Sequence, residues 1–314
     1  MCEVEMAELR GIYNILATPF DPTGAIDTGS LWNLVEFQLR CGVDGLTILG
    51  VLGEAAKLSV AERETVLQEV VSVVQGRIPI VVGVSHPQDE TCLALCRHAA
   101  AAGAAGVMVA PPSRFAETDE NHLLDYYAQL ADGIDIPIVV QDFPPVNGVT
   151  MSAAIIAQIA TNIPSARYLK LEDPPLMRKI VAILTLNSEV VIFGGLGGMF
   201  LLEELHSGAA GTMTGFAFTE ILIAVERAFR AGNLALAERI FDRYLPLIRY
   251  ENQPLINLTL RKYILYLRGA IAHPDPREPY EPLGHEAQEE LTWVLQRVGI
   301  DDPSEMIQLE ETEV

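Results

Sequence analysis

Long apolar runs and cysteines are both scarce in this chain of 314 residues. No run approaches the roughly 20 apolar residues that a helix needs to cross a bilayer. The four cysteines (Cys2, Cys41, Cys92 and Cys96) are too few and too scattered for the disulfide framework of a secreted protein. The acidic start, residues 1–10, lacks the charged-then-apolar layout of a signal peptide. These absences predict a reduced, cytoplasmic protein with no membrane partner.

Positive charge is scarce as well. Lysine and arginine together number 21 against 42 acidic residues, which gives a formal net charge of −21. Such a surface repels nucleic acid, so we expect no nucleic-acid partner. An anionic small molecule would need local positive charge or backbone donors at its site. Much of the acid lies in residues 301–314, which we expect to form a solvated acidic tail.

Apolar residues, by contrast, make up half of the chain and alternate in a regular way. Short β-branched runs typical of buried parallel strands are followed by longer amphipathic runs typical of helices. The predicted strands are residues 12–18, 45–49, 78–84, 106–110, 136–141, 168–172, 190–194 and 210–214. The predicted helices between them are residues 28–41, 59–75, 88–102, 119–132, 152–162, 174–186 and 197–207. Further helices are predicted at 218–231, 233–249, 254–269 and 285–298.

Eight strands that alternate with helices predict an α/β fold, a (β/α)8 TIM barrel. We place the barrel at residues 10–230, a C-terminal helical extension at 231–300 and the acidic tail at 301–314. A doubly wound open sheet is the alternative. Its dinucleotide-binding form is weakened because no GxGxxG motif follows the first strand.

Only four lysines occur, and Lys170 is the one that lies inside an apolar strand-like run, residues 166–172. An amine in an apolar interior loses the solvation of its charged form, which favours the free amine. A free amine can attack a ketone and form a Schiff base. The structural alternative is a lysine that extends to the rim of the sheet.

Glu172 follows two residues later and must point to the same side of the strand as Lys170. A carboxylate beside an imine-forming amine can move protons for it. The alternatives are a simple ion pair with Lys170 or a capping role in the turn before Pro174. Gln141, at the end of the fifth strand, is the third candidate in this group.

The carboxyl ends of barrel strands carry the active sites of this fold. At the second strand the turn Gly50–Gly53 exposes backbone N–H groups of the kind that bind carboxylates. Glu54 is interpreted as an acceptor that braces this turn. Arg114 and His86 also lie at strand ends, and Arg114 is the nearest plausible cation for a substrate carboxylate.

Together these residues resemble the dihydrodipicolinate synthase / N-acetylneuraminate lyase family of class I aldolases. The resemblance covers about residues 10–300. It rests on the following features: Ala17-Thr18-Pro19, the Gly50-x-x-Gly53-Glu54 turn, Pro144, Lys170, Gly194-Gly195, Gly211 and the helical extension. It implies a homo-oligomer, a dimer or tetramer, in which Lys170 forms an imine with pyruvate or another 2-oxo acid. It also implies a substrate-binding region formed by the turn, with Gly195 and Met213 on neighbouring strands.

The departures from the family pattern are as informative. Val51 and Leu52 stand where the family usually has two hydroxyl residues. Gln141 replaces the tyrosine that relays protons, Val146 replaces an arginine of the synthases, and Ser113 stands near their second tyrosine. The hydroxyl relay is therefore absent, which argues against dihydrodipicolinate synthase and sialic acid lyase activity. An apolar pair at 51 and 52 would favour an apolar aldehyde half.

The sequence thus predicts a metal-independent, cofactor-free lyase acting through Lys170 on a 2-oxo acid, by aldol cleavage, condensation or dehydration. A dehydratase or hydratase of 2-oxo-3-deoxy acids is the second prediction, with Glu172 as the acid. A barrel that binds a 2-oxo acid without turnover is the alternative from another class. A metal-dependent aldolase is disfavoured because no cluster with ligand spacing lies at the strand ends. Cys92 and Cys96, one helical turn apart, are interpreted as small buried helix residues.

Overall fold

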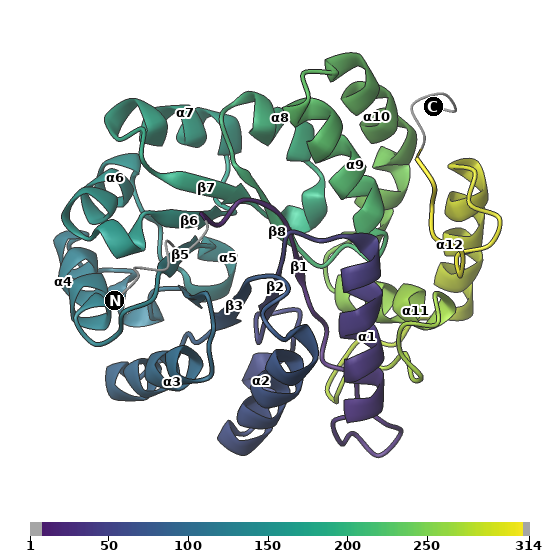
Figure 1. The fold of residues 1–314 in the computed structure, drawn as a ribbon, viewed down its shortest axis with the longest axis horizontal. Helices are drawn as coiled ribbons and strands as arrows, with labels where there is room; N and C mark the ends of the chain where they lie inside the picture. Colours follow the sequence, from purple (N-terminus) through teal and green to yellow (C-terminus); the bar gives the residue numbers. More distant parts are fainter. Residues whose placement is uncertain (1–7, 310–314) are drawn as a thin grey trace.

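The computed structural model describes residues 8–309, so the predictions for residues 1–7 and 310–314 lie outside the described part. Eight parallel strands close into a barrel in sequence order, as predicted (Figure 1). They are β1 (Gly11–Ile15), β2 (Gly45–Ile48), β3 (Ile80–Gly83), β4 (Gly106–Val109), β5 (Ile138–Asp142), β6 (Tyr168–Leu171), β7 (Val191–Gly194) and β8 (Gly211–Thr214).

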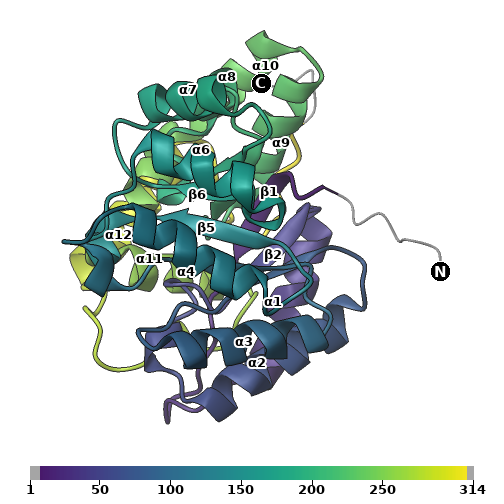
Figure 2. The ribbon, with the colours of Figure 1, turned by 90° about the vertical axis from the view of Figure 1, so that its left-hand side faces the viewer.

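The helices surround this barrel in the predicted order. They are α1 (Thr28–Cys41), α2 (Val60–Val74), α3 (Asp89–Ala101), α4 (Asn121–Ala131), α5 (Pro144–Asn147), α6 (Ala153–Asn162), α7 (Leu176–Leu186), α8 (Leu201–His206), α9 (Thr219–Arg230), α10 (Leu234–Glu251), α11 (Asn257–Leu267) and α12 (His285–Arg297). From the side, α3, α4 and α6 follow one another around the barrel (Figure 2). The short helix α5 was not predicted. It begins with Pro144 and Pro145 and makes only about one turn, which is too short to show a helical period in the sequence.

The first strand is shorter than predicted. It ends at Ile15, whereas the sequence pattern continued to Thr18. The side chain of Thr18 turns to the neighbouring loop instead, where its Oγ1 donates to the backbone oxygen of Gly53 at 2.6 Å. Pro19 cannot donate a backbone hydrogen bond, so the ladder could not continue through it.

Two apolar cores follow from the alternation of side chains along each strand. The smaller fills the barrel and includes Tyr13, Met108, Phe193 and Met213. The Tyr13 and Phe193 rings meet edge to face with centroids 5.4 Å apart. The larger core lies between the strands and the surrounding helices and continues into the extension.

The cap of α2 shows how local sequence sets a helix start. Ser59 and Glu62 form a reciprocal capping box, as their spacing predicted. The Ser59 hydroxyl accepts from the Glu62 backbone N–H, and the Glu62 carboxylate accepts from the Ser59 backbone N–H at 2.8 Å. This cap positions α2 directly after the turn at the end of β2.

The extension α10–α12 packs against the barrel beside α1 and α9 (Figure 1). Its contacts reach the loops at the carboxyl ends of the strands, which we call the mouth. Asn252 donates to the backbone oxygen of Leu196 at 2.9 Å, and Lys262 donates to that of Thr18 at 3.1 Å. The extension therefore braces the part of the barrel where an active site is expected.

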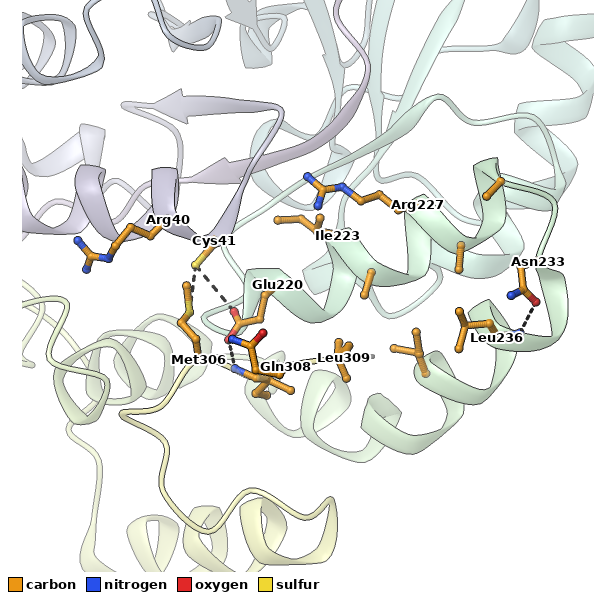
Figure 3. A pocket seen from close by; sticks show the side chains of 15 residues that line it. Arg40, Cys41, Glu220, Ile223, Arg227, Asn233, Leu236, Met306, Gln308 and Leu309 are labelled. Atoms are coloured by element: carbon orange, nitrogen blue, oxygen red, sulfur yellow. Dashed lines mark hydrogen bonds between the residues drawn. The ribbon is translucent and has the colours of Figure 1, made fainter. Parts of the chain in front are cut away.

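The described end of the tail is not a solvated extension. Met306, Ile307 and Leu309 are partly buried against the main core, and the Ile307 N–H donates to Glu220 Oε1 at 3.4 Å. Figure 3 shows Met306 and Leu309 beside a cavity of about 520 Å³ between α1, α9 and α10, and Ile307 lines the same cavity. The solvated-tail prediction fails for these three apolar side chains, which pack against the core, whereas the acidic side chains of Asp301, Asp302 and Glu305 are exposed.

Candidate active site

Lys170 lies in the barrel interior, at the mouth end of β6. Its backbone is in register with Gln141 on β5 and with Phe193 on β7. Only 4% of the residue's surface is exposed. It points the same way as Tyr168, which belongs to the barrel core, because residues two apart in a strand share a side. Lys170 therefore faces the lumen and does not extend to the outer rim.

Glu172 lies against Lys170, as the shared strand side predicted. Its Oε2 is 2.9 Å from Lys170 Nζ and accepts from Gln141 Nε2 at 3.1 Å. Its Oε1 accepts from the backbone N–H of Leu196 at 3.3 Å. A salt bridge to Lys170 is thus present, and the carboxylate is also held by two further donors. The three residues proposed as a catalytic group are brought together in one buried cluster.

Gly195 lies beside this cluster, at a position where a side chain would not fit. A Cβ at this position would lie 2.5 Å from Glu172 Oε1. Met213 on β8 is fully buried in the barrel core, in register with Tyr13 on β1. The substrate-binding role expected for Gly195 and Met213 stays a prediction.

The turn Gly50–Gly53 follows β2 at the mouth. The N–H groups of Gly53 and Ala55 donate to the backbone oxygen of Gly50 and close the turn. Over residues 8–309, the N–H groups of Val51 and Leu52 donate to no acceptor of the protein. The two side chains differ: Val51 is 56% exposed, whereas Leu52 packs on the barrel core. Of the two, only Leu52 faces the site.

Glu54 braces the turn from below. It is 3% exposed, and its Oε1 lies 3.2 Å from Lys262 Nζ. Its Oε2 accepts from Lys57 Nζ and from the backbone N–H of Arg277, each at 3.0 Å. Both carboxylate oxygens are thus occupied, which fits the structural role expected for this residue.

Arg114 and His86, which also follow strand ends, lie away from Lys170. Arg114 is exposed and pairs with Asp89 on α3, and its guanidinium donates to the backbone oxygen of Pro87 at 2.7 Å. The ring Nδ1 of His86 accepts from the backbone N–H of Gln88 at 3.1 Å. Neither takes part in the cluster around Lys170.

Several buried charged residues were not predicted from the sequence, and three of them have shifted pKa values. Lys262 on α11 is fully buried, and burial lowers its pKa to about 8. Glu204 on α8 is 1% exposed, and burial raises its pKa to about 8, with Glu172 adding to the effect. Asp142, next to Gln141, is fully buried beside Lys179, and its pKa is raised to about 6 by burial. These three residues lie in sequence patterns typical of amphipathic helices or strands. The position of a charged residue in such a pattern does not show whether its side chain is buried.

Comparison with known proteins identifies the family. A family model described as the dihydrodipicolinate synthetase family matches residues 8–298. The chain belongs to this family. It is an enzyme of the lyase class, of the aldolase or dehydratase type, and members of this family process small molecules.

Individual relatives within the family differ in activity. The chain is 33% identical over 293 residues to an L-2-keto-3-deoxyarabonate dehydratase of Azospirillum brasilense, covering 92% of this chain and 94% of that protein. It is 30% identical over 297 residues to a 4-hydroxy-tetrahydrodipicolinate synthase of Syntrophus aciditrophicus, covering 93% and 99%. Among solved structures it resembles a dihydrodipicolinate synthase from Rhodopseudomonas palustris, with 37% identity, a TM-score of 0.86, and 92% and 97% of the two chains covered.

Residues 8–309 hold no group of three or more His, Cys, Asp or Glu side chains placed to bind a metal ion. None of the helices in that part of the chain combines the length and apolarity of a membrane-spanning segment. The cysteines Cys41, Cys92 and Cys96 are free and buried in helices. Cys92 and Cys96 are therefore packing residues, as interpreted from the sequence.

Proposed function

We propose that the protein is an imine-forming lyase that dehydrates a 2-oxo-3-deoxy acid through Lys170. The observation that carries this proposal is the buried pair of Lys170 Nζ and Glu172 Oε2, 2.9 Å apart in the lumen. The relative that is 33% identical is named as a dehydratase of a 2-keto-3-deoxy acid, which supports this substrate class. The absence of a tyrosine at Gln141 argues against the synthase reaction.

The ion pair supplies the first step. Transfer of the ammonium proton from Lys170 to Glu172 yields the free amine, which attacks the C2 ketone. Loss of water from the carbinolamine then gives the imine. The backbone N–H groups of Val51 and Leu52 are free to receive the substrate carboxylate at the mouth.

Dehydration then needs one base and one acid. A proton leaves C3, and the electron pair moves into the imine to form an enamine. The C4 hydroxyl leaves with a proton as water, and hydrolysis releases the amine. Glu172 is the group placed to take the C3 proton and return it to the leaving hydroxyl, because it is within hydrogen-bond distance of the amine.

Aldol cleavage of the same imine is the second candidate function. It breaks the C3–C4 bond after a base removes the C4 hydroxyl proton, and it releases an aldehyde. Leu52, an apolar side chain at the mouth where the family usually has a hydroxyl residue, favours an aldehyde half with an apolar part. We further propose a homo-oligomer, dimer or tetramer, located in the cytoplasm.

The test is borohydride trapping with pyruvate, followed by digestion and peptide mass measurement. We expect a stable adduct on Lys170 in the native protein. The matched variant Lys170→Arg keeps a cation beside Glu172 and should give no adduct, while Lys57→Arg should trap normally. Absence of an adduct in the native protein, with pyruvate and with longer 2-oxo acids, would leave a barrel that does not form an imine and would sink the proposal.

An adduct without turnover of any 2-oxo-3-deoxy acid would indicate a barrel that binds 2-oxo acids without catalysis. Product analysis distinguishes the remaining candidates. Dehydration releases no aldehyde fragment, whereas cleavage releases pyruvate and an aldehyde in equal amounts.

A further inference from the structure

A buried arginine from the extension reaches the mouth of the barrel. Arg261 on α11 is 1% exposed, although it carries a full charge. Its neighbour Gly215 directly follows β8. A Cβ built on Gly215 would lie 2.9 Å from Leu52 Cδ1 and 3.1 Å from Arg261 Cδ. The arginine stem and the Leu52 side chain therefore both approach Gly215 at the mouth. This places Arg261 near the turn whose backbone N–H groups are free to bind a carboxylate.

One end of this guanidinium is anchored. Arg261 Nε donates to Glu251 Oε1 at 2.6 Å. Glu251, at the end of α10, also accepts from the backbone N–H of Ala217 at 3.0 Å. Because Glu251 is fully buried and holds both donors, it fixes the arginine in place.

The other end has no partner. Within residues 8–309, Arg261 Nη2 is buried and makes no hydrogen bond to the protein. A buried donor without an acceptor costs about 1–3 kcal/mol, and such groups in folded proteins call for an explanation. A ligand acceptor that arrives at the mouth would remove this cost. A guanidinium fork is also well matched to the two oxygens of a carboxylate.

The other cations near the mouth are already committed. Arg114 pairs with Asp89 at the surface. Lys262 donates to Glu54 and to the backbone oxygens of Thr18 and Asp275. Val146 stands where the resemblance implied an arginine in the synthases. A protein of net charge −21 needs local positive charge or backbone donors to hold an anionic substrate. Arg261, although paired with Glu251, keeps a buried donor that has no partner within residues 8–309.

We infer that Arg261 binds the carboxylate of the 2-oxo acid, together with the backbone N–H groups of Val51 and Leu52. This inference rests on the proposed function. It assigns to the C-terminal extension a direct part in substrate recognition. It also explains how the turn can work without the hydroxyl side chains that positions 51 and 52 lack.

The experiment compares pyruvate with methyl pyruvate, which keeps the ketone but lacks the charge. Borohydride trapping on Lys170 is measured over a range of ligand concentrations. In Arg261→Lys, which keeps a cation against Glu251 but has no fork, we expect the half-saturating pyruvate concentration to rise about 10-fold or more. The value for methyl pyruvate should change by less than about 2-fold, because its recognition does not use the charge.

Two further variants make the result decisive. Arg114→Gln, at the exposed arginine, should trap both compounds as the native protein does. The double variant Arg261→Gln/Glu251→Gln removes the buried pair together and should reproduce the selective loss for pyruvate if the single variant unfolds. Equal losses for the two ketones, or no loss for pyruvate, would overturn the role of Arg261. If the native protein traps neither ketone, the proposed function fails first, so the two failures are distinguishable.

Discussion

Glu172 has one carboxylate and three neighbours that hold it. Gln141 and the backbone N–H of Leu196 fix its orientation, and Lys170 Nζ lies 2.9 Å from its Oε2. In the proposed mechanism, the residue that forms the imine is thus distinct from the residue that moves protons. The two roles can therefore be tested one at a time.

We predict that Glu172→Gln still gives the borohydride adduct on Lys170, but more slowly, because the ammonium has lost its proton acceptor. We also expect kcat to fall by about 10²–10³-fold, because glutamine keeps the shape and loses the proton transfer. Trapping and turnover are measured on the same preparation. Gln141→Met is the control, since it removes one donor to Glu172 and keeps the carboxylate, and it should lose much less. Turnover of Glu172→Gln at the native rate would rule out its role.

Glu204 is a buried carboxyl whose pKa changes strongly on folding. Both of its carboxylate oxygens are buried and make no hydrogen bond within the described part of the chain, and a Cβ on Gly194 would collide with them. Its pKa rises from 4.5 to about 8 in the folded protein. The folded state therefore holds a proton that the unfolded chain has released. The contribution of Glu204 to folding stability is fully present below about pH 4.5 and is lost as the pH rises through about 8.

We predict that Glu204→Gln removes this decline and stabilises the protein at pH 9 by on the order of a few kcal/mol relative to the native chain. Urea unfolding at a series of pH values measures the difference. Glu203→Gln, at the exposed neighbour, should change the pH dependence only slightly, because the charge of Glu203 raises the pKa of Glu204 less than burial does. A native-like decline in Glu204→Gln would mean that other groups cause it.

At the scale of elements, α11 ties the extension to the barrel. Its consecutive residues Arg261 and Lys262 pair with two different elements, Arg261 with Glu251 at the end of α10 and Lys262 with Glu54 after β2. Lys262 Nζ also lies 4.5 Å from the centroid of the Phe20 ring, after β1. One helix thus holds the loops after β1, β2 and β8 in place.

We predict that Lys262→Met destabilises the protein by about 3–5 kcal/mol, because it leaves Glu54 with one buried partner fewer. Lys57→Met removes the partly exposed partner of the same carboxylate and should cost only about 0–1 kcal/mol. Both are measured by urea unfolding. In a double-mutant cycle, Lys262→Met/Glu54→Gln should recover part of the loss, and strict additivity would argue against a coupled pair.

At the scale of the whole molecule, a net charge of −21 repels itself across the surface. We predict that raising NaCl from about 20 mM to about 300 mM at pH 8 increases Tm, because the screening length falls from about 20 Å to below 10 Å. Thermal unfolding by circular dichroism measures this. The same change near pH 4.6, the isoelectric point, should have little effect. A decrease of Tm with salt at pH 8 would show that surface ion pairs outweigh the net repulsion.

The order and spacing of the strands could be predicted from the sequence because each buried parallel strand is a short apolar run of its own. The pairing of Lys170 with Glu172 was also predictable, since residues two apart in a strand share a side. The end of β1 was missed because a side-chain bond from Thr18 to Gly53 replaced the ladder. The buried tail residues were missed because acidic neighbours masked their apolar spacing.

The sequence alone therefore determined the barrel, its order and the pairing of Lys170 with Glu172, because these depend on local period and on neighbours in the chain. Only the tertiary structure decided which distant charges become buried together. Arg261 and Lys262 reach the mouth from an element more than 200 residues beyond Thr18 and Glu54. The sequence around Arg261 and Lys262 has the pattern of a helix with exposed charged residues. Their burial depends on which other elements the fold packs against that helix.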